Sequence, residues 1–284
     1  MLVKNLISLY EKKLNEVGVH NSEAEIRLMI QEILNIDLAS QFLEKNLLIN
    51  KKQEKLIKKC LDRRLNREPL DRILNKKVFR DFELFLNSNT FSPRKETELI
   101  VDIIINLKVN PNYILELGTG SGAISIALMK IFPKAKCVAT DINYKSLELA
   151  KKNAKKNYVL NQINFICCNW LDIFVNFEFD IIVANPPYIE TKVIKELDPE
   201  VKCYDPIIAL DGGKNGIDCY KKIITGLDQK KFSRSSKILF EIGYDQAQQV
   251  STLMKEAKIM RTRVFKDYSH QPRFVIGTIT KSTN

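Results

Sequence analysis

The chain has 284 residues, more than a single domain usually holds, and this length predicts two domains. Its hydrophobic content of 45% is ordinary for a globular protein, and no apolar run approaches the roughly 20 residues that span a bilayer. Six cysteines without a C-x-x-C pair and only two histidines argue against a metal site or a disulfide framework. The first residues lack a signal-peptide pattern, which favours the cytoplasm.

The net charge of +11 suggests a nucleic-acid partner. The lysines, however, are spread among glutamates along many predicted helices, a pattern typical of a solvated surface. We therefore expect no direct sequence-specific nucleic-acid binding. A basic surface that faces an RNA-associated partner stays open.

Residues 1–75 carry apolar residues at helical spacing and predict a small antiparallel helical bundle. Ser22 followed by Glu25 predicts a capping box at the start of one helix, and Asn50 with Gln53 begins another. The charges of this segment nearly balance, so it does not have the character of a strong polyanion binder. The pattern indicates an interaction or support module.

Residues 76–93 have a different residue pattern from the helical segment. Two short runs of β-formers, 78–79 and 82–86, are separated by Arg80-Asp81 and predict a hairpin that links two domains. Strands and helices then alternate through residues 94–284. This alternation predicts an α/β domain with a mostly parallel sheet and helices on both faces.

A glycine-rich turn follows the first strand of this domain, residues 113–117, and precedes a helix over 123–132. Glycines allow a tight turn and close approach of the backbone, and the helix start offers free amides to a ligand. The spacing is G-x-G-x-G with an acid two places before it, unlike the G-x-G-x-x-G of dinucleotide sites. The candidate ligand-binding residues here are Glu116, Gly118, Thr119, Gly120, Ser121 and Gly122.

Two further candidates follow the next strands. Asp141 follows the strand over 136–140. A carboxylate at this position is expected to accept hydrogen bonds from both hydroxyls of a ribose. Its alternative role is to cap the helix that follows, and the two roles are compatible. Trp170 follows the strand over 163–168 and either packs on an adenine ring or belongs to a core or interface.

The fourth strand, 179–184, ends in Asn185-Pro186-Pro187-Tyr188. The prolines forbid helix and hold the asparagine and the tyrosine on a stiff turn. The asparagine amide and free backbone carbonyls can accept the hydrogens of a planar NH2 group while the tyrosine ring covers its face. The alternative is a loop that merely ends the strand.

With these pieces placed, the chain resembles the class I S-adenosylmethionine-dependent methyltransferases. Within them it is similar to the release-factor N5-glutamine methyltransferases, the HemK/PrmC-type family. The resemblance extends along essentially the whole chain. Its segments are 67–70, 93–98, 116–124, 179–189, 204–206, 209–213, 216–218 and 241–246.

The resemblance implies a Rossmann-like methyltransferase sheet with an N-terminal all-α bundle joined by a short β-hairpin. Residues 1–75 would recognise the substrate, 76–93 would form the linker, and 94–284 would bind S-adenosylmethionine and transfer its methyl group. The substrate would be the glutamine of the Gly-Gly-Gln loop in peptide chain release factors. The sequence does not determine the oligomeric state, and a monomer is the default expectation.

The implied catalytic residues are Asn185, Pro186, Pro187 and Tyr188. The implied cofactor-binding residues are Glu116, Gly118, Thr119, Gly120, Ser121, Gly122, Asp141, Trp170 and Asn185. The sequence departs from the family pattern at Lys95, Asn169 and Asp205, and it lacks the usual glycine before Arg273. Asn169 weakens the expected polar contact with the adenine.

Two alternatives stay open at this stage. The tetrapeptide also suits an adenine-N6 or cytosine-N4 nucleic-acid methyltransferase, which the positive charge favours. Against that alternative, no separate basic target-recognition domain is visible in the sequence. The other alternative is a non-catalytic regulator that binds the cofactor.

Overall fold

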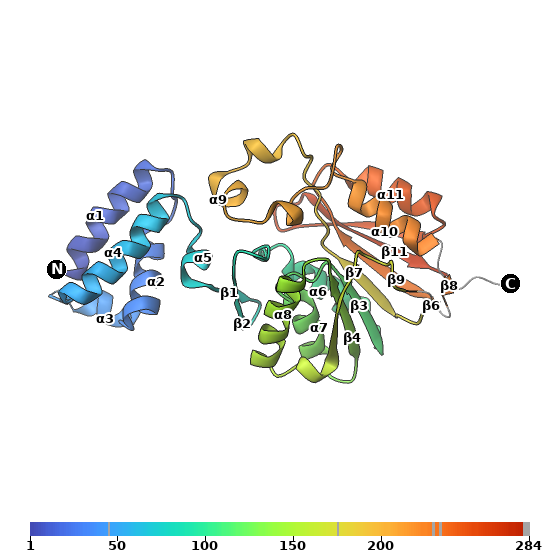
Figure 1. The fold of residues 1–284 in the computed structure, drawn as a ribbon, viewed down its shortest axis with the longest axis horizontal. Helices are drawn as coiled ribbons and strands as arrows, with labels where there is room; N and C mark the ends of the chain where they lie inside the picture. The colour runs from blue at the N-terminus through green and yellow to red at the C-terminus, as the bar shows by residue number, and fades with distance from the viewer. Residues whose placement is uncertain (45, 175, 229–230, 233–234, 281–284) are drawn as a thin grey trace. The chain divides into compact units, whose positions relative to one another are not determined.

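A computed structural model of the chain describes residues 1–44, 46–174, 176–228, 231–232 and 235–280 (Figure 1). The chain forms two compact units. One comprises Met1–Lys76 together with Asp198–Tyr204, and the other comprises Lys77–Leu197 together with Asp205–Asn284. Among the described residues, no helix combines the length and the apolar character needed to cross a membrane.

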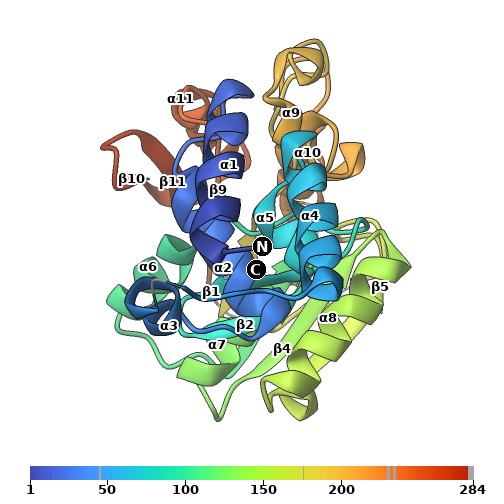
Figure 2. The same cartoon turned by 90° about the vertical axis from the view of Figure 1, so that its left-hand side faces the viewer.

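The first unit is helical, as predicted. Its helices are α1 (Val3–Glu16), α2 (Ser22–Leu34), α3 (Leu38–Leu43), α4 (Lys51–Leu65), α5 (Leu70–Leu74) and the short α9 (Pro199–Lys202). Helix α2 packs against both α1 and α4 (Figure 2). Apolar residues recur at helical spacing within each helix, and the resulting faces meet in one core, in which Leu6 of α1, Ile26 of α2 and Ile57 of α4 are fully buried.

The predicted helix start at Asn50 is confirmed and carries a capping box, whereas the capping box predicted at Ser22 is wrong. At α4, the Asn50 side chain accepts from the Gln53 amide, and the Gln53 side chain accepts from the Asn50 amide. At α2 the N-cap is Asn21, and no side chain caps the helix. The Ser22 hydroxyl instead donates to Asn15, and Glu25 pairs with Arg64 on α4. A tertiary ion pair thus replaces the local cap.

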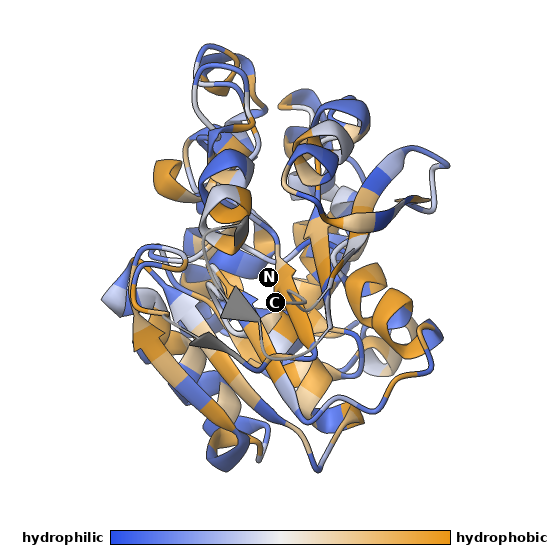
Figure 3. Cartoon of the chain, turned by 90° about the vertical axis from the view of Figure 1, so that its right-hand side faces the viewer, coloured by the Kyte–Doolittle hydropathy of each residue, from blue (hydrophilic) through white to orange (hydrophobic). Residues whose placement is uncertain are grey.

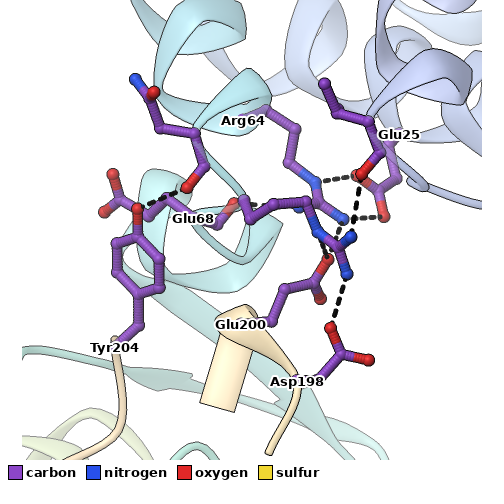
Figure 4. A network of polar contacts seen from close by, with 9 residues as sticks. Glu25, Arg64, Glu68, Asp198, Glu200 and Tyr204 are labelled. Atoms are coloured by element: carbon purple, nitrogen blue, oxygen red, sulfur yellow. Dashed lines mark hydrogen bonds and ion pairs between the residues drawn. The ribbon is translucent and has the colours of Figure 1, made fainter. Parts of the chain in front are cut away.

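Arg64 is a buried cation of the helical unit, with a side chain that is only 3% exposed. Its Nε lies 2.5 Å from Glu25, and its Nη2 lies 2.9 Å from Glu200 (Figure 4). A buried guanidinium requires such carboxylate partners, because desolvation would otherwise make its charge costly. Glu200 belongs to α9, so this pairing ties a distant part of the sequence to the bundle.

Three more contacts attach the segment Asp198–Tyr204 to the same bundle. Arg67 pairs with Asp198 at 2.7 Å and with Glu200 at 3.0 Å. The Tyr204 hydroxyl donates to the backbone oxygen of Asn66 at 2.8 Å (Figure 4). The segment therefore belongs structurally to the helical unit, although it lies within the sequence of the α/β unit.

The second unit begins with the predicted hairpin and continues as an α/β fold. The hairpin strands are β1 (Lys76–Phe79) and β2 (Phe82–Phe85). The α-helices that follow are α6 (Glu98–Asn106), α7 (Ala123–Ile131), α8 (Tyr144–Lys156), α10 (Asp218–Asp228) and α11 (Ala247–Glu256). Short 3-10 turns occupy Leu160–Gln162, Ile194–Glu196 and Ile207–Ala209.

A seven-stranded sheet forms the centre of this unit, in the order β10-β11-β9-β7-β3-β4-β5. The strands are β3 (Tyr113–Leu117), β4 (Lys136–Asp141), β5 (Ile163–Cys167), β7 (Ile181–Ala184), β9 (Ser236–Glu241), β10 (Met260–Lys266) and β11 (Pro272–Ile279). Strands β5, β4, β3, β7 and β9 are parallel, while β11 and β10 are antiparallel. A separate parallel pair joins β6 (Asn176–Phe177) to β8 (Lys231–Phe232).

Alternate residues of each central strand face opposite sides of the sheet, and both sides are covered by helices. Ile114 of β3 packs in the core with α6, α7 and α8, whereas its neighbour Leu115 packs in the core with α10 and α11. Because both faces of the central strands are buried, these strands are mostly apolar, and Figure 3 shows much of the sheet in orange. The predicted Rossmann-like α/β fold with an N-terminal helical bundle and a short hairpin is confirmed.

Candidate active site

The predicted site residues follow four neighbouring strands, β7, β3, β4 and β5. Asn185 follows β7, Gly118 follows β3, Asp141 ends β4, and Trp170 lies three residues beyond β5. These strands are parallel, so their carboxyl ends share one edge of the sheet. In open α/β sheets, ligands bind at this edge.

The turn after β3 has three glycines in the left-handed region, at φ values of +72° for Gly118, +55° for Gly120 and +83° for Gly122. Side chains are strained at such angles, which explains the glycines. A Cβ added to Gly120 would meet no atom within 4 Å, so the backbone is open on that side. The turn thus presents bare backbone to a ligand.

Glu116 lies beneath this turn and is 1% exposed. Its carboxylate accepts from the Thr119 hydroxyl at 2.6 Å and from the Ser125 amide at 3.0 Å. Burial raises the pKa of Glu116 to about 7, although these hydrogen bonds oppose the rise. This geometry favours an indirect role in ligand binding, in which Glu116 fixes the shape of the glycine turn.

Asp141 joins the end of β4 to the same turn. Its Oδ2 accepts from the Gly120 amide and its Oδ1 from the Asn143 amide, each at 2.8 Å. The cap of α8 is Asn143, which accepts from the Lys145 amide, so the alternative role of Asp141 as the helix cap is wrong. Each carboxylate oxygen retains a lone pair, which leaves capacity for two ribose hydroxyls.

Trp170 lies against the glycine turn. A Cβ added to Gly118 would come within 3.4 Å of its ring atom Cζ3. The ring also packs against the core below α10 and α11, and it is partly buried. Beside Asp141, the apolar Ile142 is 54% exposed and borders the same strand end. Both of the original alternatives for Trp170, adenine contact and core packing, are compatible with this position.

Asn185 and Tyr188 lie on a turn whose base is buried. The Asn185 amide nitrogen donates to the Thr97 hydroxyl at 3.4 Å. Among the described residues, neither the Asn185 side-chain oxygen nor the Pro186 carbonyl has a hydrogen-bond partner. Burial and the nearby Glu241 raise the pKa of Tyr188 to about 12, so the phenol stays neutral at physiological pH. Two acceptors and a neutral ring thus remain free at the strand end.

Segments far along the chain support this turn. The Gln246 side chain donates to the Tyr188 and Gly216 carbonyls at 2.9 and 3.0 Å and accepts from the Gly243 amide. A Cβ added to Gly212 would lie 2.8 Å from the Pro187 oxygen. The absence of a side chain at Gly212 is therefore a packing requirement of the proline turn.

Thr97, Glu241 and Gln246 had no individual role predicted from the sequence. Thr97 contacts Asn185 directly, and Glu241 is a fully buried carboxyl group in the same neighbourhood. Thr97 and Gln246 lie within the motifs that carry the family resemblance, and so does Glu241. Their contacts are tertiary, so the sequence alone gives only the hint that polar residues occur at the ends of buried segments.

Comparison with known proteins identifies the family. The Methyltransferase small domain family matches residues 87–198, and the PrmC N-terminal domain family matches residues 5–74. The chain is 34% identical to the release factor glutamine methyltransferase of Agrobacterium fabrum, over 92% of each chain. The chain belongs to the release factor glutamine methyltransferase family. The corresponding protein of Thermodesulfovibrio yellowstonii is 33% identical, over 91% of this chain and 93% of that protein.

Other relatives are longer. The chain is 31% identical to the bifunctional methyltransferase of Rickettsia felis over 96% of its own length, and it spans 57% of that relative. Among solved structures, the catalytic domain of hMettl16 in complex with MAT2A 3'UTR hairpin 6 aligns with a TM-score of 0.54 and 14% identity. The alignment covers 71% of this chain and 76% of that one, and it supports the fold of the α/β unit.

The residues at the strand edge fit the cofactor of this family, S-adenosylmethionine. Asp141 supplies a carboxylate with spare acceptor capacity, and the open backbone at Gly120 allows close approach of a ligand. Gly118 has no side chain, so the Trp170 ring can lie against the turn. The acceptor turn at Asn185 follows the adjacent strand, β7, so cofactor and acceptor groups can meet at one edge.

Proposed function

We propose that the chain transfers a methyl group from S-adenosylmethionine to the side-chain amide nitrogen of the glutamine in the Gly-Gly-Gln loop of peptide chain release factors. The observation that carries the proposal is the pair of free acceptors, Asn185 Oδ1 and the Pro186 carbonyl, next to the glycine turn. The similarity over 92% of a release factor glutamine methyltransferase supports the same substrate.

The difficulty of this reaction lies in the acceptor. An amide nitrogen is a poor nucleophile because its lone pair is delocalised into the carbonyl group. Asn185 Oδ1 and the Pro186 carbonyl would each accept one hydrogen of the substrate NH2 group, and this would orient the nitrogen and support its developing positive charge. Tyr188 would pack against the amide plane.

Gly118–Gly122, Asp141 and Trp170 would hold the cofactor. When bound, S-adenosylmethionine supplies an electrophilic methyl group on a positively charged sulfur. The residues at the acceptor turn need no strong base, because the methylated amide can lose its proton to water after transfer. Their contribution is orientation of the nitrogen and exclusion of water from the turn. Consistent with this, burial raises the pKa of Tyr188 to about 12, so its phenol keeps its proton and does not act as a base.

The helical unit would grip the release factor away from its loop, leaving the loop free to enter the acceptor turn. Residues 1–75 would serve as this recognition domain, 76–93 as the linker and 94–284 as the methyltransferase domain. We expect the chain to act as a monomer in the cytoplasm, without direct sequence-specific nucleic-acid binding.

A transfer assay with labelled S-adenosylmethionine and three acceptors tests the function. The acceptors are a release factor, its variant with alanine in place of the loop glutamine, and nucleic acid. We expect label on the wild-type release factor alone. Label on nucleic acid alone would support the adenine-N6 or cytosine-N4 alternative, and no label on any acceptor would support a non-catalytic regulator.

A further inference from the structure

Glu241 is a buried carboxyl group beside the acceptor turn. It ends β9, which pairs with β7 up to Phe240 and Ala184, so Glu241 and Asn185 follow neighbouring residues of adjacent parallel strands. Its side chain is 2% exposed. An acid so fully buried needs a reason, because the interior disfavours its charge.

The surroundings of Glu241 include the groups that hold Asn185. The Thr97 and Asn185 side chains both interact with the Glu241 carboxyl as hydrogen-bonding groups that favour its anion. Thr97 also accepts from the Asn185 amide nitrogen at 3.4 Å. The Oε2 atom of Glu241 has no hydrogen-bond partner among the described residues. The carboxyl group therefore has capacity for a donor that these side chains can supply.

The donor and acceptor capacities of Glu241, Thr97 and Asn185 fix the direction of the hydrogen bonds between them. An ionised carboxylate only accepts hydrogen bonds, whereas a hydroxyl can accept one bond and donate another. If Glu241 accepts from Thr97, the Thr97 oxygen must accept from Asn185, and Asn185 must present its NH2 group inward. The Asn185 oxygen then faces outward, as an acceptor. A flipped amide would present NH2 to the substrate NH2, and two donors repel.

We propose that Glu241 is a positioning residue for methyl transfer, which fixes the orientation of the Asn185 amide directly and through Thr97. The proposal rests on the proposed function, because it assigns Asn185 Oδ1 as the acceptor of a substrate hydrogen. Glu241 itself does not contact the substrate. It acts by excluding the Asn185 rotamer in which nitrogen and oxygen are exchanged.

The state of Glu241 depends on the charges around it. Burial is the largest influence and raises its pKa to about 7, while Arg273 on β11 lowers the pKa and Glu96 raises it. Tyr188 and Tyr220 also face this region as neutral phenols, and Arg94 acts on Tyr188. The acceptor orientation of Asn185 is therefore expected to strengthen as pH rises through about 7.

The test compares Glu241→Gln with wild type in two readouts. A glutamine can donate as well as accept, so this substitution removes the fixed direction of the hydrogen bonds while the side chain keeps nearly the same shape. We expect kcat on release factor to fall roughly 10- to 100-fold, with unchanged S-adenosylmethionine affinity by calorimetry. The wild-type kcat should rise with pH through about 7, and the variant should lack this rise.

The second readout does not depend on activity. By NMR, the Asn185 side-chain amide signals should titrate with a midpoint near the Glu241 pKa of about 7 in wild type and not in Glu241→Gln. Glu98→Gln is the matched control, since Glu98 is also a buried glutamate but accepts from the Arg80 amide. It should keep kcat and the Asn185 titration.

Thr97 provides an independent pair of variants in case Glu241→Gln fails to fold. Thr97→Val removes the hydroxyl and should lower kcat, whereas Thr97→Ser retains it and should preserve kcat. Wild-type kcat in Glu241→Gln, or an Asn185 titration that persists in it, would overturn the positioning role. If wild type labels no release factor but the Asn185 titration depends on Glu241, the proposed function fails while the orientation stands.

Discussion

Asn185, Asp141 and Glu116 show how polar residues near strand ends acquire their roles from their surroundings. Asn185 follows β7, Asp141 ends β4 and Glu116 lies one residue before the end of β3, so the predicted strands were sufficient to bring them to one edge of the sheet. Their partners were not predictable. Thr97 lies 88 residues from Asn185 in sequence, and Glu241 meets Asn185 only because β9 pairs with β7.

Glu116 makes stability depend on pH. Its pKa rises from 4.5 in the unfolded chain to about 7 in the folded one, so between these values the folded state holds a proton that the unfolded state has released. The free energy of unfolding should therefore fall as pH rises from about 4.5 to 7. Glu116→Gln mimics the protonated acid and should remove on the order of 3 kcal/mol of this decline.

Urea unfolding of wild type and Glu116→Gln at several pH values measures this effect. The difference between the two proteins isolates Glu116, because all other titrating groups are shared. The same pH dependence in both proteins would contradict the assignment. The measurement does not require the cofactor, so it tests the residue's buried state separately from catalysis.

At the scale of elements, the order and period of apolar residues predicted the alternating strands and helices of the α/β unit. The segments that begin at Ser22 and at Asn50 look alike in sequence, yet only Asn50 forms a capping box. Glu25 instead forms an ion pair with Arg64. The attachment of Asp198–Tyr204 to the bundle had no sequence signal, because α9 has only 4 residues and depends on Arg64 and Arg67.

The turn after β7 depends on the packing of the loop at Gly212. A methyl group there would lie 2.8 Å from the Pro187 oxygen and from Tyr188 Cα. Both contacts involve backbone, which cannot move aside as a flexible side chain can. Gly212→Ala should therefore displace the turn and lower kcat roughly 100-fold, and overpacking should destabilise the fold by about 1–3 kcal/mol.

Gly226→Ala is the matched control for this substitution. It lies in α10, where the three atoms nearest to an added Cβ all belong to the Leu171 side chain, the nearest at 3.1 Å. Steady-state transfer assays and thermal unfolding of both variants should show loss of turnover for Gly212→Ala alone. Equal turnover in the two variants would show that the close approach at Gly212 does not control the turn.

At the scale of the whole molecule, the length of the chain predicted two domains, and the family resemblance predicted their nature. The helical unit carries no catalytic motif, and its buried contacts serve its own stability through Arg64 and the attached segment Asp198–Tyr204. The choice of a protein amide over a nucleic-acid amine therefore lies outside the tetrapeptide Asn185–Tyr188. It requires a measurement on the intact chain.

Mapping the transferred methyl group by peptide mass spectrometry tests the central claim most directly. The intact chain and its Asn185→Ala variant are incubated with S-adenosylmethionine and a release factor, with calorimetry reporting cofactor affinity. We predict a methyl group on the side chain of the loop glutamine for wild type, and transfer lowered at least roughly 100-fold for Asn185→Ala at unchanged cofactor affinity. A methyl group on another residue, or near wild-type transfer by the variant, would contradict the account.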